Sequence, residues 1–285
     1  MKLIGEKGVQ RLLLVIAFSA ISALLLIALF IINEGLPFIF RYGLKGFLLS
    51  SDWYPQEGKF GIFAMIVASL WVTVGAMIIG APLGIGAAAF LSEFVPRSVM
   101  RVMKPTIELL AAIPSVVYGF IGVMVLAPII RDALGGPGLS VLAGSIILGI
   151  MILPTIISIS IDSILAVPQS YREGSLALGA TTWQTTLMVT LRAAKSGIIA
   201  SLILAMGRAI GETMAVIMVA GNAVKIPGSV LDSARTLTAN IALEMSYATG
   251  VHRQALFATG VVLFVVIIIL NSLASAAIRG RAPKR

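Results

Sequence analysis

The sequence predicts an all-α, polytopic membrane protein that forms a single domain over residues 1–285. Of these residues, 59% are hydrophobic and only 12% are charged, which is far more apolar than a soluble domain of this size. The apolar residues form uncharged runs that exceed the roughly 20 residues a helix needs to cross a bilayer. Basic residues flank these runs, so the net charge of +9 indicates membrane topology and not nucleic-acid binding.

Six apolar runs of the sequence are predicted to be membrane spans. They cover about residues 12–32, 60–92, 107–130, 139–161, 196–224 and 254–278. The first run has 21 uncharged residues. It exceeds the roughly 7–15 residues of a signal-peptide core, so we expect it to be retained as a helix.

Glycine and proline interrupt the second, third and fourth runs. The second is 33 residues long, about 50 Å as one helix, and we expect a bend or a break at Gly80–Pro82. The third contains Pro114 and Pro128, and the fourth contains Pro154. Prolines inside spans are tolerated where neighbouring helices or cavity water satisfy the freed carbonyl groups, so they do not exclude these runs as spans.

The distribution of basic residues predicts the orientation of the spans. With the N-terminus in the cytoplasm, 13 of the 21 basic residues lie inside, seven lie outside and Arg208 lies in the membrane. This excess predicts a multi-pass inner-membrane protein with cytoplasmic N- and C-termini. The inside residues are Lys2, Lys7, Arg11, Arg97, Arg101, Lys104, Arg172, Arg192, Lys195, Arg279, Arg281, Lys284 and Arg285. The outside loops, residues 33–59 and 225–253, are long enough for short helices, and His252 is expected to be solvated.

Composition also limits the chemistry of the chain. It has no cysteine and a single histidine, so thiolate and histidine-based metal sites are not expected. The segment Gly174-x4-Gly179-Ala180-Thr181 is close to a phosphate-binding P-loop but lacks its lysine, so we expect no ATP binding. We find no other catalytic motif and predict that the chain is not an enzyme and binds no cofactor itself.

Arg208 and Glu212 are the charged residues inside the fifth run. A charge near the bilayer midplane costs roughly 3 kcal/mol and needs a partner. Glu212 is four residues on, on the same helical face, but Arg before Glu is the less favourable order for stabilising a helix. One interpretation is a static ion pair that fixes helix register. We favour a path for a charged solute, in which Glu212 or a partner chain's carboxylate neutralises Arg208 until an anion passes.

Three more residues complete the candidate path. Thr213 follows Glu212, and Ser115 and Tyr118 lie beside Pro114 in the third run. Pro114 frees a backbone carbonyl, and Ser115 offers a hydroxyl to the path. The alternative for Ser115 is a packing kink, with its hydroxyl bonded to its own helix.

The longest inside loop, residues 163–195, contains two predicted helix starts. Ser170 with Glu173, and Thr181 with Gln184, have the spacing of a capping box. Pro168 favours the start of the first helix, and Gly179 is placed to end it. We expect a helix–turn–helix at the membrane surface, either without a partner or docked into a groove of another protein.

The residues of this loop resemble a known family. Glu173-Gly174-Ser175-x3-Gly179-Ala180, followed by Val189-Thr190-Leu191, resembles the EAA loop of ABC importer permeases, on which ATPase subunits dock. The loop departs from the common form in two places, Gly174-Ser175 for two alanines and Arg192 for a proline. The resemblance implies that Glu173, Gly174, Ser175, Gly179 and Ala180 form the surface that couples to the ATPase.

Three longer stretches extend the resemblance to the PstC-type permeases of phosphate importers. They are PLGIGAAAFLSEF (82–94), KPTIELLAAIPSVVYGF (104–120) and GRAIGETMAVIMVAGN (207–222). The resemblance implies the type I (MetI-like) ABC importer permease fold and ATP-driven import of inorganic phosphate. It also implies a PstA-like second permease, two PstB-like ATPase subunits that bind ATP and Mg²⁺, and a PstS-like phosphate-binding protein.

Three other functions compete with this one. A sulfate or molybdate permease shares the loop but lacks the GRAIGETMAV stretch. A stand-alone secondary transporter has paired halves with matching broken helices, which we do not find in the sequence. A sensory membrane subunit would report phosphate status through the same loop without transporting anything.

Overall fold

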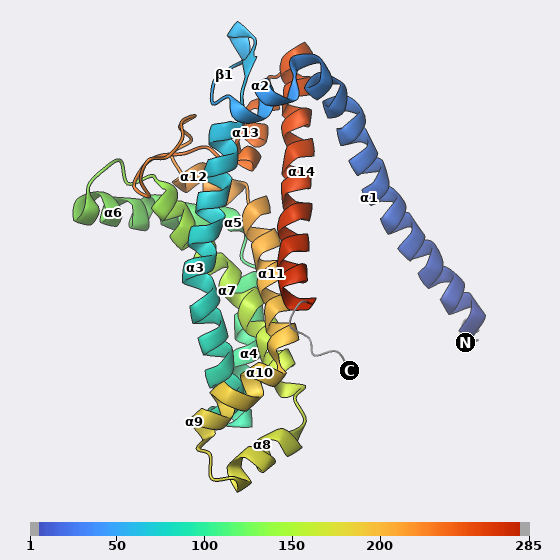
Figure 1. The fold of residues 1–285 in the computed structure, drawn as a ribbon, viewed down its shortest axis with the longest axis vertical. Coiled ribbons are helices and arrows are strands. Elements are labelled where there is room, and N and C mark those ends of the chain that lie inside the picture. Colours follow the sequence, from blue (N-terminus) through green and yellow to red (C-terminus); the bar gives the residue numbers. More distant parts are fainter. Residues whose placement is uncertain (1–5, 280–285) are drawn as a thin grey trace.

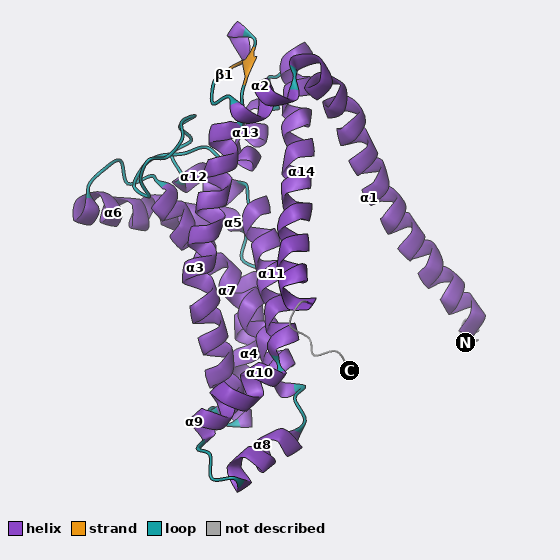
Figure 2. Cartoon of the chain, in the orientation of Figure 1, coloured by secondary structure: helices purple, strands orange, loops and turns teal. Residues whose placement is uncertain are grey.

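The computed structural model describes residues 6–279, so Lys2, Arg281, Lys284 and Arg285 of the orientation argument lie outside the described residues. Within this range the fold is helical apart from one two-stranded hairpin (Figure 2). The helices and strands are α1 (Glu6–Tyr42), α2 (Leu44–Leu49), β1 (Trp53–Tyr54), β2 (Lys59–Phe60), α3 (Phe63–Glu93), α4 (Arg97–Ala111), α5 (Ser115–Ile121), α6 (Ala127–Leu134), α7 (Val141–Leu165), α8 (Gln169–Ala177), α9 (Thr182–Thr185), α10 (Leu191–Ala193), α11 (Lys195–Gly211), α12 (Met214–Val219), α13 (Leu237–Glu244) and α14 (Gly250–Arg279). The prediction of an all-α membrane protein is confirmed.

The centre of the bundle is the pair α3 and α7, which pack along their lengths. A Cβ at Gly75 would overlap Ser145 Oγ, and one at Gly80 would lie 2.9 Å from Gly149 O. Glycine at these positions therefore lets the two backbones approach closely. α3 continues through Pro82, so of the bend or break predicted at Gly80–Pro82 the break does not occur. α11 packs on the other side of α7, where the buried Ser160 and Ser201 hydroxyls are 3.1 Å apart.

Five described helices are long and apolar enough to cross a membrane, or six if one bent pair counts as a span. The bent pair is Thr182–Ala193 with Lys195–Gly211, at 70°. Two predicted spans are wrong as continuous helices. Residues 107–130 are divided because α4 ends at Ala111 and the next helix starts only after Pro114. The residue before a proline disfavours the helical conformation, which favours a helix end here. Residues 196–224 are divided where Glu212 is extended, at φ −69° and ψ 132°.

The two ends of the bundle carry different elements (Figure 1). The helices α8, α9 and α10 lie at one end, which we call the loop end, and α1 starts and α14 ends on the side that faces it. The hairpin, α2 and α13 lie at the other, which we call the hairpin end. This arrangement agrees with an even number of crossings.

α1 meets the bundle near the hairpin end and leans away from it towards its N-terminus (Figure 1). A Cβ at Gly35 would come within 2.7 Å of the Phe257 and Ala258 backbone. This glycine permits the close crossing of α1 and α14. The predicted first span, residues 12–32, lies inside α1 and exposes a long series of apolar side chains, as expected of a helix that faces lipid or another membrane subunit.

Candidate translocation path and coupling loop

Arg208 lies in the last turn of α11, next to the end of α4. Its side chain is half-buried, and Nη2 donates to the carbonyl oxygen of Ala111, the last residue of α4, at 3.3 Å. The carbonyl groups at a helix C-terminus carry partial negative charge and favour a cation. The guanidinium lies at the C-terminal end of α4, so the helix-end carbonyl of Ala111 compensates part of its charge.

The expected position of Glu212 on the same helical face as Arg208 is wrong, whereas the alternative of a partner chain's carboxylate stays a prediction. α11 ends at Gly211, and Glu212 turns away in an extended conformation. Among the residues that the structure describes, no carboxylate lies within 4.0 Å of Arg208. Glu212 Oε1 instead accepts from the N–H of Ala215 at 3.2 Å, and Glu212 O accepts from Thr238 Oγ1 at 2.9 Å. In this conformation Glu212 caps α12.

Tyr118 and Arg208 bind neighbouring carbonyl groups at the end of α4. The Tyr118 hydroxyl donates to the carbonyl oxygen of Leu110 at 3.0 Å, one residue before the carbonyl that Arg208 binds. Ser115 is the first residue of α5, and within the described range its hydroxyl makes no hydrogen bond. Thr213 Oγ1 donates to Gly211 O at 3.3 Å. The structure thus brings Tyr118 and Arg208 together, while Glu212 and Thr213 remain in the break between α11 and α12.

The two helix breaks lie side by side because α5 packs on α12. A Cβ at Gly119 of α5 would lie 2.7 Å from Met218 Sδ and 3.1 Å from Ala215 Cα of α12. Both helices therefore start next to each other, one after each break. Irregular backbone at membrane depth is tolerated where it is buried in protein or lines an aqueous cavity, so these breaks are the place in the bundle best suited to a polar path.

The predicted helix–turn–helix is present at the loop end. α8 begins directly after Pro168, and Gly179 ends it with φ +87°. At α9 the capping box is complete, because Thr181 Oγ1 accepts from Gln184 N at 3.2 Å and Gln184 Oε1 accepts from Thr181 N at 2.9 Å. The capping box predicted at Ser170 is wrong, since Pro168 starts the helix two residues earlier and no side chain caps it.

The predicted coupling residues lie on and beside α8. Glu173, Gly174 and Gly179 are exposed, whereas Ala180 is half-buried. The hydroxyls of Ser175 and Thr185 are 2.9 Å apart and tie α8 to α9. The loop end thus presents a compact, exposed pair of helices, as a docking surface for another protein requires.

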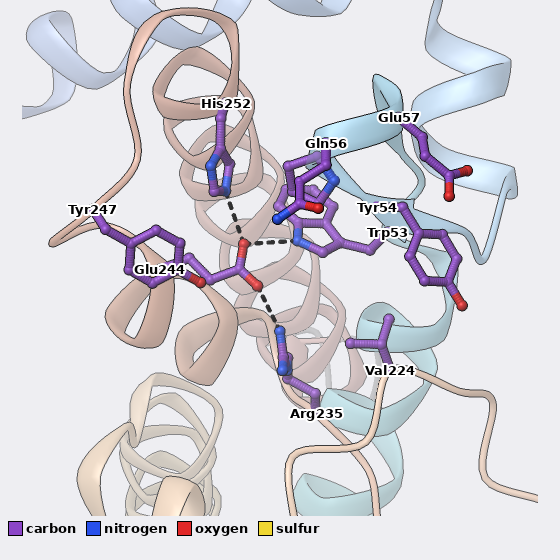
Figure 3. Close-up of a pocket in the computed structure, with 10 residues that line it drawn as sticks. Trp53, Tyr54, Gln56, Glu57, Val224, Arg235, Glu244, Tyr247 and His252 are labelled. Carbon is purple, nitrogen blue, oxygen red and sulfur yellow. Dashed lines mark hydrogen bonds and ion pairs between the residues drawn. The ribbon is translucent and has the colours of Figure 1, made fainter.

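A polar cluster at the hairpin end was missed by the sequence analysis (Figure 3). Glu244 Oε1 accepts from Arg235 Nη1 at 2.7 Å. Glu244 Oε2 accepts from Trp53 Nε1 at 2.9 Å and lies 2.8 Å from His252 Nε2. His252 was expected to be solvated, but its side chain is only 16% exposed. These residues come from the hairpin, the segment before α13, and the ends of α13 and α14, so no local pattern reveals the cluster.

A cavity of about 530 Å³ borders this cluster and is also lined by Tyr247. Burial and, to a lesser extent, the negative charge of Glu244 raise the pKa of the Tyr247 hydroxyl. The phenol therefore stays neutral through the physiological range. The cavity contains no group of three or more histidines, cysteines or carboxylates that holds a metal, as is true of all described residues.

Residues 80–282 match the family described as binding-protein-dependent transport system inner membrane component. The chain belongs to this family. YqgH of Bacillus subtilis, a probable ABC transporter permease protein, is 44% identical over 256 residues, 87% of this chain and 83% of that protein. The phosphate transport system permease protein PstC of Mesorhizobium japonicum is 39% identical over 249 residues, 80% of this chain and 76% of that protein.

Solved structures of ABC importers share the fold of the chain. A bacterial transporter that imports the acidic polysaccharide alginate superposes with a TM-score of 0.63 at 15% identity, over 98% of this chain and 99% of that chain. The MetNI methionine transporter superposes with a TM-score of 0.57 at 18% identity, over 77% and 94%. The expected type I importer permease fold is therefore confirmed, and the chain is a multi-pass membrane protein of the ABC importer permeases.

Proposed function

We propose that this chain is the permease subunit of an ATP-driven importer of inorganic phosphate and forms half of its path. The observation that supports phosphate as the substrate is the similarity to several phosphate permeases. One of them, PstC of Xylella fastidiosa, is 37% identical over 77% of this chain and 74% of that protein. Such similarity over most of the chain supports a shared substrate. The subunit resides in the inner membrane with both termini cytoplasmic, as the excess of basic residues at the loop end predicts.

In the proposed mechanism, Arg208 binds the phosphate oxyanion as it passes. A planar guanidinium with several N–H groups suits a tetrahedral oxyanion. The weak 3.3 Å contact of Arg208 with Ala111 O leaves most of its donors available. In the empty path the carbonyl oxygen of Ala111 binds the guanidinium, and a carboxylate of the partner permease is the remaining candidate to neutralise it. Tyr118, Ser115, Thr213 and Glu212 are the polar groups next to this step.

ATP hydrolysis occurs on another subunit. A PstB-like ATPase pair binds the exposed α8–α9 surface. The residues that form the contact are Glu173, Gly174, Ser175, Gly179 and Ala180. A PstA-like permease supplies the other half of the path, and a PstS-like protein delivers phosphate at the hairpin end. ATP binding closes the ATPase pair and shifts the permeases between inward-open and outward-open states because each state binds its ligands differently.

Reconstitution tests this proposal. The complete complex in vesicles should accumulate radiolabelled phosphate with ATP and the binding protein, and omission of the ATPase subunit should abolish uptake. Uptake without the ATPase would indicate a secondary transporter, and preferential uptake of sulfate or molybdate would change the substrate. A complex that binds its ATPase but moves none of these anions would support the sensory alternative.

A further inference from the structure

One buried ion pair attaches the coupling helix α8 to the membrane bundle. Arg172 of α8 and Glu93, the last residue of α3, are 14% and 7% exposed, and Arg172 Nη2 lies 2.7 Å from Glu93 Oε1. Arg172 Nε also donates to both carboxylate oxygens, at 3.1 and 3.2 Å. α8 has no fully buried residue, so apolar packing alone does not fix the helix to the bundle, and this charged pair is a strong polar contact between them.

The same guanidinium also closes the end of α7. Arg172 Nη1 donates to Val167 O at 2.8 Å, and Nη2 donates to Ile164 O at 2.9 Å. Carbonyl groups at a helix C-terminus have no partner within the helix, and a cation there is favourable. Arg172 thus joins the ends of α3 and α7, which pack together along the bundle, to the first turn of α8. A lysine has no planar fork and cannot reproduce these contacts.

A second contact joins α8 to the other half of the bundle. The Ser175–Thr185 hydroxyl pair, 2.9 Å apart, connects α8 to α9. The chain from α9 then leads through α10 into α11, which carries Arg208. A neutral hydroxyl pair is weaker than a bidentate pair with a charged group, so the attachment to α3 and α7 is the stiffer of the two.

We propose that Arg172 and Glu93 form a rigid linkage that transmits movement of α8 to α3 and α7. This inference rests on the proposed function, in which an ATPase pair moves α8. Because this largely buried guanidinium binds one carboxylate and two carbonyl oxygens, it cannot slide without leaving the Glu93 charge and these carbonyls without their partner. When the ATPase pair moves α8, the ends of α3 and α7 therefore move with it. Both residues act as positioning residues and do not touch the transported ion.

The first test measures phosphate uptake and ATP hydrolysis together in the reconstituted complex. Arg172→Lys keeps the charge but removes the fork, and Arg101→Lys is the matched control because Arg101 is exposed on α4 at the same end. We expect Arg172→Lys to lower the phosphate transported per ATP about fivefold, within the range of mutations that alter coupling. Arg101→Lys should leave this ratio unchanged. An equal fall in uptake and hydrolysis, or no change in either, would overturn the proposal.

The second test does not depend on the substrate. The chain has no cysteine, so Leu83→Cys on α3 and Ser170→Cys on α8, both exposed, allow a pair of spin labels without background. Pulsed electron paramagnetic resonance then gives their distance with and without ADP–vanadate. The distance should stay fixed in the otherwise unchanged complex and shift in the Arg172→Lys or Glu93→Gln complex. A shift already present without these substitutions would show that α8 moves independently, whatever ion the complex transports.

Discussion

Replacement of Glu244 by alanine should destabilise the hairpin end more than any other single change of charge there. Glu244 is the acceptor for Trp53, Arg235 and His252, and the side chains of Glu244 and Arg235 are 9% and 19% exposed. Removal of one partner of a buried ion pair costs about 3–5 kcal/mol. Each donor left without an acceptor costs about 1–3 kcal/mol. Water in the adjacent cavity can bind the freed donors, so we expect about 3 kcal/mol in total.

Equilibrium unfolding in mixed detergent micelles measures this free energy. Glu57→Ala is the matched control, because Glu57 lines the same cavity but pairs with Lys59 at 60% and 52% exposure. An exposed pair contributes about 0–1 kcal/mol. A loss for Glu244→Ala within 1 kcal/mol of the loss for Glu57→Ala would refute the reasoning that burial makes this cluster stabilising.

Three further predictions concern packing, capping and pH. Gly75→Ala should destabilise the bundle by about 1–3 kcal/mol through overpacking against Ser145, measured by the same unfolding assay, whereas Gly86→Ala, whose Cβ meets open space, should not. Thr181→Ala should lower the stability of α9 by about 1 kcal/mol, and Ser170→Ala should have no such effect on α8. Amide hydrogen exchange of the loop measures both effects, and equal effects would contradict the assignment of the cap to Thr181. The N–H groups of Gly228 and Ser229 lower the pKa of the Asp232 carboxyl group. The ionised carboxylate therefore stabilises this turn at pH values above the ordinary carboxyl pKa. This stabilisation is lost as the pH falls through the lowered pKa. Limited proteolysis of residues 225–235 should show this loss in the unchanged protein, and Asp232→Asn should remove its pH dependence.

Features that depend on local composition could be predicted from the sequence. An arginine inside an uncharged run is visible without a structure, and so is a capping box. The two candidate boxes show the limit of this reasoning. Thr181 and Ser170 have the same spacing to their partners, but Pro168 starts α8 before Ser170 and leaves it inside the helix. Only the box at Thr181 forms.

Features that depend on tertiary contacts were not predictable. Arg208 and Glu212 are four residues apart, but α11 ends between them and Thr238 holds the Glu212 carbonyl. Arg208 and Tyr118 instead bind the carbonyl groups of Ala111 and Leu110 at the end of α4, which requires the helix to end before Pro114. Trp53 and Glu244 are 191 residues apart in the sequence. No local pattern brings them to one carboxylate.

Arg208→Ala in the assembled importer tests the central claim most directly. The complex should form and hydrolyse ATP, but phosphate uptake should fall at least about tenfold, since a charged donor to an anion contributes roughly 1.5–3 kcal/mol. Arg208→Lys should retain part of the uptake because it keeps a point charge without the planar fork. Normal phosphate uptake by a normally assembled Arg208→Ala complex would contradict the account.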